Sequence, residues 1–206
     1  MSGLLDRIHT FRQSNAWIFS TMLVSAGLSL LASFVLSVDA IALAKNPSAN
    51  LACNINARIS CGTVGASWQA HLFGFPNAFL GLLAEPVVIT IAVASLAKVR
   101  FPRGFMLAAQ IVYTLGVVFA YWLFFQALYV IGALCPWCLL VTLSTTLVFT
   151  SLTHVNLRDN NLFLSERAHG VAMAALRMGL DAAVVTLWLV AVVALVFAKY
   201  GASLFA

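Results

Sequence analysis

Residues 104–153 read GFMLAAQIVYTLGVVFAYWLFFQALYVIGALCPWCLLVTLSTTLVFTSLT, a stretch without a single charged side chain. As one α-helix it would be about 75 Å long, more than twice the roughly 30 Å hydrocarbon core of a bilayer. The chain must therefore fold back on itself, and the turn formers Gly132 and Pro136 mark the place. This stretch predicts two membrane-spanning helices, over residues 105–131 and 136–153.

Three further apolar segments extend the pattern. Residues 16–38 carry no charge, residues 77–97 carry only Glu85, and residues 182–198 are shorter but uninterrupted. The first segment is too long for the apolar core of a cleaved signal peptide, which spans about 7–15 residues. Only 8% of the residues are charged, against about 25% in soluble domains. We therefore predict an all-α integral membrane protein, a four-helix bundle plus a fifth transmembrane helix, in a single membrane domain covering residues 1–206.

The basic residues predict an orientation. The loop over residues 39–76 lies on one side of the membrane, and the N-terminus and residues 154–181 lie on the other. The second side holds eight of the eleven lysines and arginines, which the positive-inside rule assigns to the cytoplasm. This explains the net charge of +5 without a nucleic-acid partner. The eight residues are Arg7, Arg12, Lys98, Arg100, Arg103, Arg158, Arg167 and Arg177.

Both cysteine pairs then face the extracytoplasmic side, where disulfides persist. In Cys135-Pro136-Trp137-Cys138, proline suits the first position of a helix and places Cys135 at or near the N-cap. A helix N-terminus stabilises a thiolate, the nucleophilic form of cysteine. Cys138 lies nearly one turn deeper, toward the hydrocarbon. One thiol is thus available to protein and the other to a lipid-soluble molecule.

The second pair, Cys53 and Cys61, lies in the loop over residues 39–76. Beyond it, Val64, Trp68 and Leu72 recur at helical spacing. This predicts a short helix lying flat on the bilayer as a lid. Alternatively, the aromatic residues of this segment merely anchor the loop at the membrane interface.

Two other uses of the four cysteines compete with redox chemistry. Structural zinc needs four ligands, usually from two close pairs, but Cys53 and Cys61 are eight positions apart and His71 is the only histidine on that side. We predict no metal. Alternatively, the pairs are structural disulfides that staple the loop, in which case the protein is a non-enzymatic membrane scaffold.

The order of these residues resembles the vitamin K epoxide reductase family. Along the chain stand Cys53, Cys61, Ser67, then Phe75-Pro76-Asn77 with Gly81, then Cys135-Pro136-Trp137-Cys138. The resemblance covers roughly residues 17–153, so the fifth span lies outside the shared four-helix core. Another family of four-span quinone reductases carries its Cys-x-x-Cys in the first outer loop, the reverse of the order here.

The resemblance implies an electron relay and a quinone-dependent thiol-disulfide oxidoreductase. A separate extracytoplasmic thioredoxin-fold partner would attack the Cys53–Cys61 disulfide at Cys53. Cys61 would next form a transient disulfide with Cys135, and Cys138 would pass electrons to a quinone of the menaquinone, ubiquinone or vitamin K type. Each step is thiol-disulfide exchange.

Two polar residues receive roles from the same resemblance. Asn77 would hydrogen-bond a quinone carbonyl, although it is also placed to cap the second span. Ser67 would hold the lid or a loop carbonyl. The vertebrate epoxide-reducing enzymes carry a tyrosine four residues after the last cysteine, where this chain has Thr142. Thr142 and the fifth span favour quinone reduction in a bacterial plasma (inner) membrane, with vitamin K quinone or epoxide reduction as the alternative.

Other residues allow two interpretations. Glu85 is a carboxyl within a span, either bonded to a neighbouring helix or part of a proton path. Large side chains either line a quinone pocket or pack against lipid and helices. These are Phe79, Leu80, Tyr121, Trp122, Phe125 and Tyr129.

Overall fold

The computed structural model describes residues 13–201, and over that range it is helical with no β-strand. Five helices are long and apolar enough to cross a membrane, which confirms the predicted fold class. They are α2 (Asn15–Lys45), α4 (Ala78–Leu96), α5 (Arg103–Phe125) with its extension η2 (Gln126–Ile131), α6 (Pro136–Arg158) and α8 (Leu180–Tyr200). Three short elements complete the chain: α3 (Cys61–Gly65), η1 (Trp68–His71) and α7 (Glu166–Arg177).

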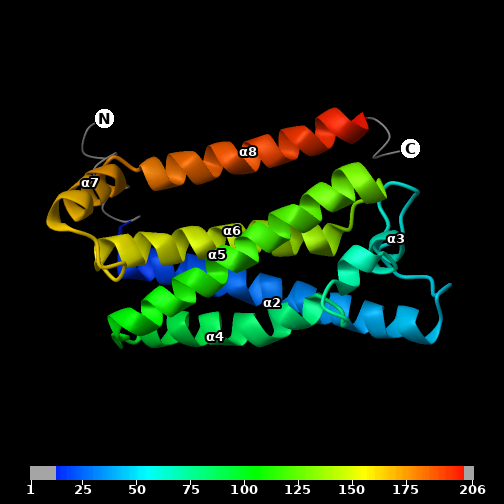
Figure 1. The fold of residues 1–206 in the computed structure, drawn as a ribbon, viewed down its shortest axis with the longest axis horizontal. Coiled ribbons are helices and arrows are strands. Elements are labelled where there is room, and N and C mark those ends of the chain that lie inside the picture. Colours follow the sequence, from blue (N-terminus) through cyan, green and yellow to red (C-terminus); the bar gives the residue numbers. More distant parts are fainter. Residues whose placement is uncertain (1–12, 202–206) are drawn as a thin grey trace.

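Four of the long helices form a bundle, and α8 runs along its outside (Figure 1). Helix α2 packs on α4 and α6, while α5 packs on α6. The helices α4 and α5 barely contact each other, which leaves space between them. The bundle core is apolar and lies toward the end at which α2 begins. Its buried members include Phe19, Met22, Val88, Ile91, Val148 and Leu152.

The closest approach of α2 and α4 depends on a glycine. A Cβ atom at Gly81 would collide with the hydroxyl of Ser33. Small residues at helix interfaces in membranes allow this close packing, where van der Waals contact replaces the hydrophobic effect as the driving force. Ser33 is itself almost fully buried, so its side chain is enclosed at this contact.

The reversal inside residues 104–153 lies where it was predicted. Helix α5 widens at its end into the π-helix η2, and Gly132 adopts a left-handed backbone (φ 74°) that glycine accepts without steric cost. The Gly132 N–H donates to the carbonyl of Ala127. Four residues after Gly132, Pro136 opens α6.

The first span is longer than predicted. The charge of Asp39 indicated a loop from that residue onward, but α2 continues to Lys45 and the loop begins at Asn46. Asp39 lines a cavity within the protein, so its charge does not end the helix. Pro47 does, because a residue before proline is pushed out of the helical conformation.

The predicted lid forms as two short helices and not as one. Helix α3 ends at Gly65, Ser67 is extended (φ −73°, ψ 150°), and η1 follows. Small residues therefore interrupt the apolar pattern that the sequence presents as continuous.

Six of the eight basic residues assigned to the cytoplasm lie at the end of the bundle opposite the cysteines, in or beside α5, α6 and α7. Arg7 and Arg12 lie outside the described residues.

Candidate active site

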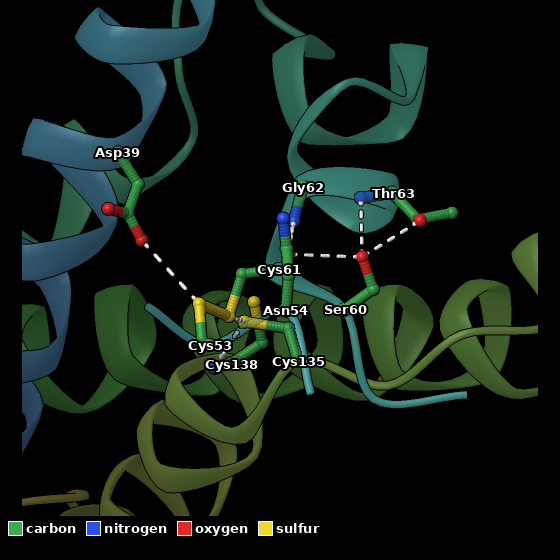
Figure 2. Close-up of a disulfide and its surroundings, with 9 residues drawn as sticks. All are labelled: Asp39, Cys53, Asn54, Ser60, Cys61, Gly62, Thr63, Cys135 and Cys138. Atoms are coloured by element: carbon green, nitrogen blue, oxygen red, sulfur yellow. Dashed lines mark hydrogen bonds between the residues drawn. A yellow bond between two sulfur atoms is a disulfide. The ribbon is translucent and has the colours of Figure 1, made fainter. Parts of the chain in front are cut away.

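A disulfide joins Cys53, in the loop that precedes α3, to Cys61 (Figure 2). Cys61 is the first residue of α3, and the Ser60 side chain caps that helix by accepting the N–H of Thr63 at 3.1 Å. The side-chain oxygen of Asn54 accepts the N–H of Gly62 at 2.8 Å. Local hydrogen bonds thus fix the position of Cys61, which is 2% exposed.

Cys135 is the N-cap of α6, as the Pro136 position predicts. Its Sγ accepts the N–H of Cys138 at 3.3 Å. Both thiols of the Cys-Pro-Trp-Cys segment are free, and Cys135 is buried while Cys138 is partly exposed. Hydrogen bonding from the Cys138 thiol and from the backbone N–H groups of Cys138 and Trp137 lowers the pKa of Cys135, against the opposing effect of burial. Cys135 is therefore a buried thiol at a helix N-terminus, in surroundings that favour its thiolate form.

The two cysteine pairs meet. The Sγ of Cys135 lies 3.2 Å from the Sγ of Cys61, although 74 residues separate them. The backbone brings them together: Leu134 donates to the carbonyl of Arg58 at 2.7 Å, and Ser60 donates to the carbonyl of Leu134 at 2.9 Å. A sulfur this close to a disulfide is placed for thiol-disulfide exchange.

Asp39 is a member of the site that sequence reasoning missed. Its Oδ2 lies 3.7 Å from the Sγ of Cys53 (Figure 2). The only sequence signal was an acid at the end of an apolar segment, and that signal indicated a loop. With Cys53 and Cys61, Asp39 forms a group whose potential metal-binding atoms lie within 4.8 Å of one another. The disulfide occupies both sulfurs of this group, which removes the thiolates that metals bind.

A cavity of about 620 Å³ lies beneath the lid, among α2, α4, α5 and α6. Cys135 and Cys138 are among the residues that line it. Leu83, Val112 and Leu115 also line it, yet they are 59–72% exposed on the outer surface of α4 and α5. The cavity therefore reaches the lipid-facing surface through the space between these two helices.

Asn77 lines this cavity at the start of α4. Its Nδ2 donates to the carbonyl of Gln69 at 2.6 Å. Its Oδ1 is buried and has no hydrogen-bond partner among residues 13–201. Asn77 stands at the N-cap position of α4 but makes no side-chain capping bond, so capping does not explain this residue. A buried acceptor without a partner is costly, and a ligand hydroxyl in the cavity would satisfy it.

Ser67 also lines the cavity. Its hydroxyl donates to the carbonyl of Val64 at 2.6 Å, which ties the two short helices of the lid together. The carbonyl of Ser67 in turn lies 3.4 Å from Nδ1 of His71.

Glu85 lies on the wall of the cavity formed by α4 and is 4% exposed. Its two carboxyl oxygens accept hydrogen bonds from Ser29 on α2 and Tyr113 on α5, each at 2.6 Å. This carboxyl therefore links three helices, and the Tyr113 bond crosses the space between α4 and α5.

Most of the large side chains proposed for the pocket lie elsewhere. Of the six, only Leu80 lines the cavity. Tyr121 instead bonds Thr146, and Trp122 stacks on Phe119. The large aromatic side chains that line the cavity are Phe73, Tyr113, Phe119 and Phe124. Packing between helices decides which helical face turns inward, and the sequence alone does not specify that packing.

The comparison with known proteins agrees with this geometry. Residues 20–153, more than half of the chain, match the model of the vitamin K epoxide reductase family. No curated protein matches the chain. The matched region contains the bundle, both cysteine pairs and the lid, and it ends before α7 and α8. The chain therefore belongs to the vitamin K epoxide reductase family, whose members are membrane oxidoreductases that act on thiols and quinones.

Proposed function

We propose that this protein reoxidises an extracytoplasmic thioredoxin-fold protein and passes the electrons through Cys53 and Cys61 to Cys135, Cys138 and a quinone. The observation that carries the proposal is the 3.2 Å contact between the sulfurs of Cys61 and Cys135. Without this contact, electrons from the loop disulfide would have no route to the thiols beside the cavity.

The relay begins at the loop disulfide. A partner thiolate attacks Cys53, and Cys61 leaves as a thiolate. Cys61 then attacks Cys135 of an oxidised Cys135–Cys138 pair, which releases Cys138. The second partner thiol frees Cys53, the partner leaves oxidised, and Cys53 attacks Cys61 to release Cys135. Two electrons have moved inward, one disulfide has replaced another at each step, and the loop disulfide is restored.

After these exchange steps Cys53 and Cys61 would be bonded and Cys135 and Cys138 would be free thiols. The described structure has the same disulfide bonding. The inner pair next reduces a quinone. The two thiols supply two electrons and two protons, the quinone becomes a hydroquinone, and a Cys135–Cys138 disulfide forms. The lowered pKa of Cys135 makes it the thiol of the pair that is deprotonated more readily, so it is prepared to bond to Cys138 as the two electrons pass to the quinone.

The quinone would occupy the cavity beneath the lid with its ring beside Cys138. Gln69 accepts one of the two Nδ2 hydrogens of Asn77, so the other is available to a quinone carbonyl. The Oδ1 atom, which has no partner in the described part of the chain, would accept a hydroquinone hydroxyl. Asn77 would thus bind both redox forms, while Ser67 holds the lid through Val64.

We place the cysteine end outside a bacterial plasma membrane and the N-terminus in the cytoplasm, because the basic residues gather at the other end. Thr142 supports quinone reduction over epoxide reduction. Its hydroxyl donates to the carbonyl of Cys138 in the preceding turn at 2.9 Å, so it is committed to its own helix.

A scaffold stapled by disulfides is the competing proposal. Its difficulty is that Cys135 and Cys138 are free thiols beside a disulfide and a cavity.

An assay of quinone reduction separates the relay from the scaffold. It combines the purified protein with a reduced thioredoxin-fold substrate and a soluble quinone analogue. The relay requires that Cys138→Ala abolish quinone reduction and accumulate either a mixed disulfide with the partner or a Cys61–Cys135 bridge. A scaffold would give no turnover with either protein.

A further inference from the structure

The fifth helix is fastened to the bundle at both ends. At its start, Asp181 lies 2.7 Å from Nδ1 of His154 on α6. At its end, the hydroxyl of Tyr200 donates to the carbonyl of Leu128 in η2 at 3.3 Å. Between these points its surface mostly faces outward, as the 72% exposure of Leu187 illustrates. A helix that only contacted lipid would not require these polar contacts with the bundle at its two ends.

The second fastening lies at the redox end of the molecule, where α8 ends beside the lid region (Figure 1). Tyr200 is 7% exposed and belongs to the same buried cluster as Leu128 and Leu134. The guanidinium of Arg58 lies 5.9 Å from the centre of the Tyr200 ring, within the range of a cation–π interaction. The ring thus contacts both segments that converge on the cysteines.

These two segments determine the sulfur contact. Arg58 and Ser60 pair with Leu134 through two backbone hydrogen bonds of 2.7 and 2.9 Å. The next residue after Ser60 is Cys61, and the next after Leu134 is Cys135. A shift of this pairing would therefore move one sulfur relative to the other.

We propose that α8 is a brace for the relay and that Tyr200 is a positioning residue. By holding Arg58 and η2 together, Tyr200 keeps the Arg58–Ser60 segment paired with Leu134 and so keeps Cys61 beside Cys135. The contact between the two sulfurs matters for turnover only if the proposed function holds. The effect of Tyr200 on the distance between the two thiols can be measured without it. Exchange between groups held in contact is much faster than exchange between groups that must find each other.

The test measures that distance chemically. In a Cys53→Ser, Cys138→Ser background only the thiols of Cys61 and Cys135 remain. With oxidised glutathione, these two thiols form one disulfide and release two molecules of reduced glutathione. The equilibrium, read by mass spectrometry in glutathione buffers, gives the effective concentration of one thiol at the other. We expect Tyr200→Ala to lower it about fivefold, as loss of one hydrogen bond with its ring contact implies, and Tyr200→Phe to keep it within twofold to threefold.

Two variants make the outcome decisive. Leu187→Ala changes an exposed residue of the same helix and should leave the effective concentration unchanged. Arg58→Gln removes the cation beside the Tyr200 ring and also the 3.5 Å hydrogen bond from Arg58 to the carbonyl of Gly132. It should lower the value even if Tyr200→Ala fails to fold. An unchanged value in Arg58→Gln and in a folded Tyr200→Ala protein would overturn the brace.

Failure of the proposed function is a separate result. It would appear as absence of quinone reduction by the unaltered protein, whatever the glutathione equilibrium shows.

Discussion

At the scale of single residues, the position of Cys135 at the mouth of α6 explains its chemistry. Cys138 lies in the first turn of α6, where an N–H has no partner within the helix, and its N–H donates to the sulfur of Cys135. The same sulfur faces Cys61 on its other side. One atom is thus both stabilised as a thiolate and placed against a disulfide.

The lowered pKa of Cys135 predicts its reactivity with pH. A thiol whose pKa lies below the usual value of about 8.5 remains a thiolate at lower pH, and its reactivity disappears only as the pH falls through the lowered pKa. We expect alkylation of Cys135 by iodoacetamide to persist to lower pH than alkylation of an unperturbed cysteine, as quantified residue by residue by mass spectrometry.

Cys138→Ala is the control for this profile. It removes the first of the donors that lower the pKa, so the alkylation midpoint of Cys135 should move to higher pH. A midpoint that is the same in both proteins would show that the Cys138 thiol does not stabilise the Cys135 thiolate.

Asn77 gives a second prediction at this scale. Asn77→Ala removes the amide whose N–H donor and oxygen acceptor would both face the proposed quinone. Loss of one to two hydrogen bonds should reduce kcat/KM for the quinone about tenfold. Steady-state kinetics with a quinone analogue measures this. Ser67→Ala is the matched control, because Ser67 bonds within the lid, and it should change the quinone KM less than Asn77→Ala does.

At the scale of elements, the contact between α2 and α4 sets the shape of the cavity wall. Gly81→Ala would force a Cβ atom into the hydroxyl of Ser33, and overpacking of this kind costs about 1–3 kcal/mol of stability. Thermal unfolding in detergent should show the loss. Gly27→Ala on α2, where a Cβ meets nothing within 4 Å, should have a melting temperature equal to or above that of the unaltered protein.

The double variant Gly81→Ala, Ser33→Gly checks the cause. Removal of the hydroxyl makes room for the added methyl group, so part of the lost stability should return. If none returns, the cost lies in the helix α4 itself and not in its contact with α2.

Elements and their order could be predicted well from the sequence, whereas contacts between them could not. Uncharged runs of about 20 residues predict spans because only a helix satisfies its backbone in lipid. The direction in which Tyr121 or Trp122 points depends on packing between helices, and such packing leaves no periodic signal when every face is apolar. Asp39 illustrates a related limit: its charge is visible in the sequence and predicts a loop, but the cavity that its side chain lines is not visible there.

At the scale of the whole molecule, the cysteines lie at one end of the spans and most of the basic residues lie at the other. We predict that an epitope inserted after Ala49 is accessible to antibody in intact spheroplasts. The same epitope inserted after Asn161 should be accessible only after the plasma membrane is permeabilised. The opposite pattern would place the cysteines in the reducing cytoplasm and contradict the proposed relay.

The opening of the cavity between α4 and α5 determines which quinone concentration would govern occupancy of the site. Leu83, Val112 and Leu115 border both the cavity and the surrounding lipid, so a quinone would arrive sideways from the bilayer. Occupancy then follows the mole fraction of quinone among the lipids, and not its amount per litre of suspension. Diluting reconstituted vesicles with buffer that holds the reduced partner protein at the same concentration should leave turnover per enzyme unchanged, whereas fusing them with quinone-free lipid should slow it.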